Sequence, residues 1–142
     1  MGQRPTERQP ELFLPATSLP QAPGHPFYRQ LNRLLAQAGF DRCCEDLCRR
    51  FFAEDLGRHS VPPGVYFRML FVGYFEGIDS QRGIAWRCAD SRSLAAFLGY
   101  LPTEATPDHS SLTKVRRRLR IPPGYDAAHL GHVVSALEGP PC

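Results

Sequence analysis

One segment of the chain, residues 60–78, is apolar on almost every side. It reads SVPPGVYFRMLFVGYFEGI, and Arg68 and Glu76 are its only charged residues. Pro62 and Pro63 suit the first turn of a helix, where their missing N–H donors would have no partner anyway. A helix that is apolar all round is stable in water only when other helices cover it. The segment therefore predicts the central helix of a bundle.

Two amphipathic segments precede this one and are expected to cover it. Their apolar residues recur at helical spacing: Phe27, Leu31, Leu34, Leu35 and Ala38 in the first, and Cys44, Leu47, Cys48, Phe51 and Phe52 in the second. Gly39 suits the left-handed end of the first helix, and the side chain of Asp41 can cap the start of the second.

The rest of the chain also has helical periodicity. Residues 79–100 predict two short helices, started by Asp79 or Ser80 and by Asp90 or Ser91, with these residues turned inward: Ile84, Ala85 and Cys88, then Leu94, Phe97 and Leu98. Further helices are predicted at 108–119 and 126–138. Because no strand-like alternation occurs, we expect an all-α multi-helix bundle of about seven helices.

The chain divides into three parts. Six prolines between residues 1 and 26 predict an extended N-terminal arm, residues 27–138 form one helical domain, and 139–142 are a tail. The five cysteines lack C-x-x-C pairs, which favours buried thiols over a zinc site. Without a long apolar run or a signal-peptide pattern, we expect a soluble cytoplasmic protein with no membrane partner.

The segment TPDHSSLTKVRRRLR, residues 106–120, predicts a helix with two different faces. Leu112, Val115 and Leu119 share the side that should be buried. The opposite side collects Ser110, Thr113, Lys114, Arg117 and Arg118. One interpretation is a solvated helix whose last arginines complement the helix dipole. The other is a surface that meets a negatively charged partner.

Three predicted helices favour the second interpretation. They lie near 80–89, 91–98 and 108–119, and together they have the lengths of a helix-turn-helix-like unit spanning residues 79–120. In such a unit the last helix enters the DNA major groove and the earlier helices cross the backbone. The pattern therefore predicts double-stranded DNA as the partner.

Two longer stretches resemble a known family. VPPGVYFRMLFVGYFEGIDSQRGIAWRCADSRSLAAFLGY and TPDHSSLTKVRRRL are similar to the N-terminal DNA-binding region of bacterial insertion-sequence transposases of the DDE class. The leader LFLPATSLPQAPGHPFYRQLNRLLAQAGFD is similar too, so the resemblance runs through almost the whole chain. It implies binding to the terminal inverted repeats of a mobile element, in the nucleoid.

The same resemblance implies a catalytic domain that this sequence lacks. The family cuts and joins DNA through three acidic residues that hold two metal ions, and the first of these is expected in a strand after a helix like 126–138. The sequence ends at EGPPC. We therefore expect a truncated transposase fragment that is not an enzyme and needs no metal or other cofactor.

The resemblance and the helical pattern together single out a set of DNA-binding candidates: Ser110, Ser111, Thr113, Lys114, Arg117, Arg118 and Arg120, with Arg82 and Arg87 on the helix at 80–89. Trp86 is interpreted as core packing, and a metal site at His129 and His132 is disfavoured because no third ligand shares their spacing. The alternative function is an interaction or inhibitory fragment, which forms a homodimer or pairs with full-length transposase through residues 63–77 and the last helix.

Overall fold

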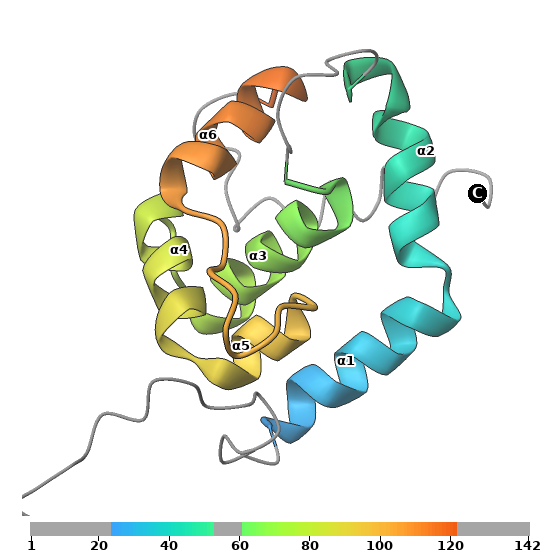
Figure 1. Cartoon of the computed structure of the whole chain (residues 1–142). Helices are drawn as coiled ribbons and strands as arrows, with labels where there is room; N and C mark the ends of the chain where they lie inside the picture. Colours follow the sequence, from blue (N-terminus) through green and yellow to red (C-terminus); the bar gives the residue numbers. More distant parts are fainter. Residues whose placement is uncertain (1–23, 53–60, 122–142) are drawn as a thin grey trace, which may run out of the picture.

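The computed structural model describes residues 24–52 and 61–121, and the elements in these ranges are all helices (Figure 1). The described part has six helices and no strand, which agrees with the all-α prediction. They are α1 (Pro26–Gln37), α2 (Phe40–Phe52), α3 (Pro63–Glu76), α4 (Gln81–Asp90), α5 (Arg92–Phe97) and α6 (His109–Arg118). The predicted arm up to residue 23, helix at 126–138 and tail at 139–142 lie outside the described residues.

Helix α3 is the centre of the bundle, as its apolar sequence predicts. It contacts α2, α4 and α6, and most of its residues are buried: Gly64, Tyr66, Phe67, Arg68, Met69, Leu70, Val72 and Gly73. Leu112 and Val115 of α6 belong to the same core, together with residues of α4 and α5. None of the described helices is long and apolar enough to cross a membrane.

The buried faces of α1 and α2 differ from the predicted ones. On α1, Tyr28 is buried whereas Phe27 and Leu34 are largely exposed, and on α2 Leu47 is exposed. Helix α1 packs mainly against α2 and α5 and reaches α3 through side chains, and its inward row runs through Tyr28, Leu31 and Leu35 instead. The Tyr28 ring packs against Phe97, with 5.1 Å between ring centroids.

Three cysteines of α2 and α4 are core residues, as expected, whereas Cys43 of α2 is disulfide-bonded and only partly buried. Cys44, Cys48 and Cys88 are buried and form no disulfide. Burial raises the pKa of the Cys44 and Cys88 thiols to about 12, so both stay protonated at neutral pH. These three positions are therefore packing residues.

One buried arginine joins the first three helices. Arg68 of α3 binds both carboxylate oxygens of Asp41 on α2, and its Nε donates to Oδ1 of Asn32 on α1 over 3.2 Å. Its guanidinium also lies 5.3 Å from the centroid of the Phe40 ring. Asp41 was predicted to cap α2, but α2 begins at Phe40 and the carboxylate pairs with Arg68 instead. A tertiary ion pair has replaced the local cap.

The second half of the bundle follows the predicted boundaries closely. Ser80, Ser91 and Asp108 cap α4, α5 and α6 by accepting a backbone N–H from the first turn of each helix. The predicted inward residues of these helices are buried: Ile84, Ala85, Cys88, Leu94, Phe97, Leu98, Leu112 and Val115. Short polar side chains thus fix where each helix starts, and the apolar row fixes which face is buried.

Candidate nucleic-acid interface

Helix α6 turns its apolar row inward and its cations outward. Leu112 and Val115 are buried, whereas four basic residues near its end are exposed: Lys114, Arg117, Arg118 and Arg120. Arg116, which borders the apolar row, is partly buried. Within the described residues, Lys114, Arg117 and Arg120 form no ion pair with a carboxylate. Their charges are therefore available to an external anion.

Helix α4 lies beside α6 and supports it. The Thr113 hydroxyl lies 2.8 Å from Oε1 of Gln81 and 2.9 Å from the His109 carbonyl oxygen, within hydrogen-bonding distance of both. At the other end of α4, Ala89 lines a small hollow together with Thr106 in the segment that leads into α6. The row from Gln81 to Ala89 therefore faces α6 and the segment that leads into it, and Figure 1 shows α6 beginning beside the start of α4.

The three hydroxyl candidates already have partners within the chain. Ser110 donates to Asp108 over 3.0 Å, the Ser111 backbone N–H donates to the same carboxylate over 2.7 Å, and Thr113 is held as described above. The positive start of α6 thus already carries a negative charge of its own. The cations in the second half of α6 are better placed for an external anion.

This carboxylate gives the start of α6 a pH dependence. Hydrogen bonds from Ser111, through its side chain and its backbone N–H, and from Ser110 lower the pKa of Asp108 to about 2. A carboxyl group in an unfolded chain titrates near ~3.9, so the cap contributes its full stability above roughly pH 5 and loses it as pH falls through about 2.

The Asp108→Asn variant tests this assignment, because asparagine caps a helix but does not titrate in this range. The difference in urea midpoint between wild type and D108N, followed by circular dichroism, should shrink steadily between pH 5 and pH 2. A difference that stays constant over that range would show that the Asp108 charge has no part in holding α6.

The arginines of α4 have different surroundings. Arg82 is exposed and has no ion pair among the described residues. Arg87 donates from Nε to Oε2 of Glu76 over 2.5 Å, and Glu76 also accepts the Tyr28 hydroxyl over 3.0 Å. Burial, with the nearby Glu76, raises the pKa of Tyr28. Arg82 thus keeps an unpaired charge, whereas Arg87 is neutralised by its own chain.

Trp86 was predicted to lie in the core, and that prediction is wrong. Its side chain is 64% exposed, the largest value among the exposed large apolar residues of the described chain. The signal was present in the sequence, because Ile84, Ala85 and Cys88 define the inward face of α4 and Trp86 lies on the opposite side. Its aromatic character outweighed its position in the prediction.

Arg120 occupies an unusual backbone position at the end of α6. Its φ is +55°, and it is the one non-glycine residue with positive φ in the described chain. The Arg120 N–H donates to the Arg117 carbonyl and the Ile121 N–H to the Arg116 carbonyl, the pattern of a Schellman cap. Glycine has this left-handed conformation at the corresponding ends of α1, α3 and α5, at Gly39, Gly77 and Gly99. At the end of α6 the same strained position is occupied by an arginine, so a cationic side chain stands where those helices have glycine.

Most of the chain matches one known protein family. The family model for the transposase domain DUF772 matches residues 17–118, most of the chain. The chain belongs to this transposase-domain family. No curated protein and no solved structure matches it. The matched region contains α1 to α6 completely, and it ends at Arg118, so Arg120 lies beyond it.

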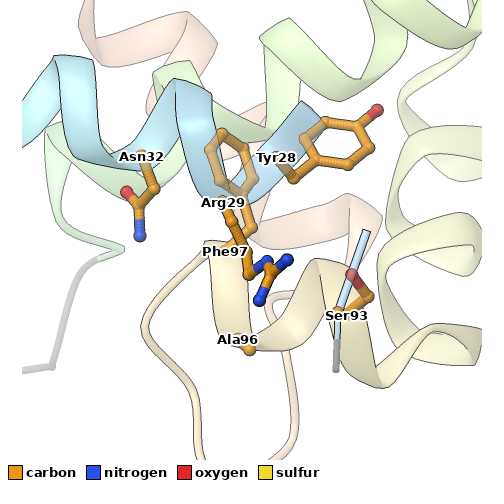
Figure 2. Close-up of a pocket in the computed structure, with 7 residues that line it drawn as sticks. Tyr28, Arg29, Asn32, Ser93, Ala96 and Phe97 are labelled. Carbon is orange, nitrogen blue, oxygen red and sulfur yellow. The ribbon is translucent and has the colours of Figure 1, made fainter. Parts of the chain in front are cut away.

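Two small hollows lie among the described residues of the transposase domain. One, between α1 and α5, measures about 180 Å³ and is lined by Tyr28, Arg29, Asn32, Ser93, Ala96 and Phe97 with Gly24 (Figure 2). The hollow beside Ala89 has the same volume. Small-molecule sites usually measure about 300–1,000 Å³.

Acidic and metal-binding side chains are scattered over the described part of the chain. The described residues contain no group of three or more His, Cys, Asp or Glu side chains that would hold a metal ion. Several of the acids have structural roles instead: Asp41 pairs with Arg68, Glu76 with Arg87, and Asp108 caps α6.

Proposed function

We propose that this transposase domain binds double-stranded DNA through the outer face of α6, and that its targets are the terminal inverted repeats of an insertion sequence. The observation that carries the proposal is the division of α6 into two faces. Leu112 and Val115 anchor it in the core, and Lys114, Arg117 and Arg120 point their charges outward with no carboxylate partner in the described chain.

The dimensions of an α-helix support this mode of binding. A helix with its side chains is about 10–12 Å across, and the DNA major groove is about 12 Å wide. Arginine can donate two hydrogen bonds to O6 and N7 of guanine, and both arginine and lysine neutralise phosphates. In this proposal Arg117 and Lys114 enter or border the groove, and Arg82 and Arg120 contact the backbone on either side.

Helices α4, α5 and α6 then act as a helix-turn-helix-like unit. Helix α4 contacts both of the others, and α6 also contacts α3. The connection from α5 to α6 covers residues 98–108, which is longer than the 3–4 residues usual in a helix-turn-helix. The proposed unit is therefore a variant in which the recognition helix rests on α4 and on the central helix.

The proposal assigns these helices to end recognition and not to strand transfer. Two-metal strand transfer needs carboxylates that converge on ions about 4 Å apart. The carboxylates of the described residues are engaged in caps and ion pairs or stand apart on the surface, as set out above. Binding is the activity that their geometry supports.

A fluorescence anisotropy titration tests the target. A labelled duplex that carries the inverted repeat flanking the gene is compared with a shuffled duplex of equal length, at one salt concentration. Sequence-specific proteins bind their sites at least about 10³-fold more tightly than other DNA. A preference of this order is expected. Equal affinity for both duplexes would exclude recognition of the element ends, and no binding to either would exclude the DNA-binding function itself.

Replacing Arg120 by glycine should change stability and DNA affinity in opposite directions. In the Arg120→Gly variant the positive φ is no longer strained, so the free energy of unfolding should rise by about 1 kcal/mol. The same change removes one phosphate contact and should weaken DNA binding about tenfold. Urea unfolding and the anisotropy titration measure the two effects. A variant that is more stable and binds DNA at full affinity would remove Arg120 from the interface.

A second function, pairing with another copy or with full-length transposase, is favoured by an aromatic cluster on the surface. Phe27, Tyr74 and Phe75 are each more than two-fifths exposed. The Phe27 and Phe75 ring centroids are 4.8 Å apart, and those of Tyr74 and Phe75 are 5.2 Å apart. Light scattering with and without the duplex separates the two functions. A DNA-binding monomer supports the first, and a dimer that binds no DNA supports the second.

A further inference from the structure

The Trp86 side chain is the most exposed large apolar side chain of α4. Its indole is 64% exposed, although Ile84, Ala85 and Cys88 on the other side of the same helix are buried. Arg82 lies one turn before it on the same outer row and is exposed too. A solvated indole beside an unpaired guanidinium is a combination that suits recognition more than folding.

This row borders the exposed face of α6. Gln81 bonds to Thr113, and Ala89 meets Thr106 at a shared hollow, so the row Gln81, Ala85, Ala89 faces α6 and its leading segment. Arg82 and Trp86 lie in the next row outward. On α6, Arg117 lies one turn after Thr113 on the same side. The outer rows of the two helices therefore approach each other where α6 meets the start of α4 (Figure 1).

We propose that Trp86 contacts the DNA backbone beside the groove that α6 occupies; this inference rests on the proposed DNA-binding function. The indole N–H donates to a phosphate oxygen, and the ring packs against the adjoining deoxyribose. Tryptophan offers one donor and no acceptor at the end of a flat apolar body, which matches a phosphate next to a sugar. Arg82, one turn away, neutralises the neighbouring phosphate.

The charged residues near Trp86 indicate which part of α4 would contact the DNA. Arg82 is exposed on the same row, and Arg117 is exposed on the side of α6 that carries Thr113; neither has an ion pair in the described chain. Asp90, one turn beyond Trp86, is exposed as well and would repel phosphate. The contacted part of α4 therefore runs from Arg82 to Trp86. Tryptophan and arginine also dominate protein interfaces, but the unpaired cations on this edge favour a polyanion.

The test uses Trp86 itself, because it is the single tryptophan of the chain. The unlabelled inverted-repeat duplex is added to the full chain, and tryptophan emission and its quenching by acrylamide are recorded. Binding should shift the emission toward the blue or quench it, and should shield the indole from acrylamide. A dilution series without DNA should leave the emission unchanged.

Variants give the matching affinities by anisotropy of a labelled duplex. Trp86→Ala should weaken binding roughly tenfold, the equivalent of one hydrogen bond to a charged group. Trp86→Phe keeps a ring without the donor and should lose only part of that affinity. Leu34→Ala removes another apolar side chain that is more than half exposed, from α1, and should have no effect.

The same measurements separate an error about Trp86 from an error about DNA binding. If the duplex binds at full affinity while the emission and the acrylamide quenching stay unchanged, Trp86 is outside the interface and DNA binding stands. If no duplex binds, both proposals are wrong. If the emission shifts with protein concentration alone, Trp86 belongs to a contact between copies of the chain, and the DNA contact is overturned.

Discussion

The double variant Lys114→Ala/Arg117→Ala is expected to bind inverted-repeat DNA about 100-fold more weakly than the wild type, at roughly tenfold for each lost cation. Both side chains are exposed on α6, and neither has a carboxylate partner in the described chain. Their removal therefore leaves no buried charge behind. The fold should be unaffected, because the apolar row of α6 is untouched. Anisotropy titration measures the affinity, and circular dichroism checks the fold.

A matched control removes two charges elsewhere. Arg33 on α1 and Arg42 in the first turn of α2 are exposed, and Figure 1 shows α1 and the start of α2 away from α6. The Arg33→Ala/Arg42→Ala variant has the same net charge as the test variant and should bind DNA nearly as well as the wild type. Equal losses in both variants would mean that DNA responds to total charge and not to the face of α6.

The largest effect on stability is expected from Arg68→Met. The change removes the ion pair with Asp41, the hydrogen bond to Asn32 and the contact with the Phe40 ring, so α1 and α2 lose their common partner on α3. The loss of one member of a buried ion pair costs about 3–5 kcal/mol when a buried charge is left behind; because the Asp41 side chain is 56% exposed and can be solvated, we expect about 2 kcal/mol. The melting temperature should fall by roughly 5–10 °C.

A second variant, Asp41→Asn, keeps a hydrogen-bond acceptor for Arg68 but leaves this guanidinium, whose side chain is 8% exposed, without its counter-charge, so it should also destabilise. Gly64 packs closely against the pair, since a Cβ at that position would overlap the Asp41 carboxylate. Thermal unfolding followed by circular dichroism measures both variants. If Arg68→Met unfolds at the temperature of the wild type, the three helices are held by apolar packing alone.

Local patterns were sufficient to predict half of the bundle. The central position of α3 follows from an apolar sequence that no single face can bury. The starts of α4, α5 and α6 follow from Ser80, Ser91 and Asp108, whose short side chains bond to the N–H groups of the next turn. The two faces of α6 follow from the spacing of Leu112 and Val115.

The remaining features depend on contacts between distant residues. Asp41 could cap its own helix, and only the position of Arg68 on α3 decides that it does not. Arg87 has the appearance of a free surface cation until Glu76, eleven residues earlier, is placed beside it. Tyr28 is buried in place of Phe27 because Phe97 and Glu76 receive its ring and hydroxyl. The spacing of apolar residues along the chain cannot predict which residue a distant partner will pair with or bury.

The salt dependence of DNA binding tests the central claim most directly. If three to five of the cations contact phosphates, a plot of log affinity against log salt should have a slope of roughly −3 to −4.5, at about −0.9 for each contact. In Lys114→Ala/Arg117→Ala the slope should become less steep by about 1.8. A wild-type slope near zero, or an identical slope in wild type and variant, would contradict a DNA interface on the outer face of α6.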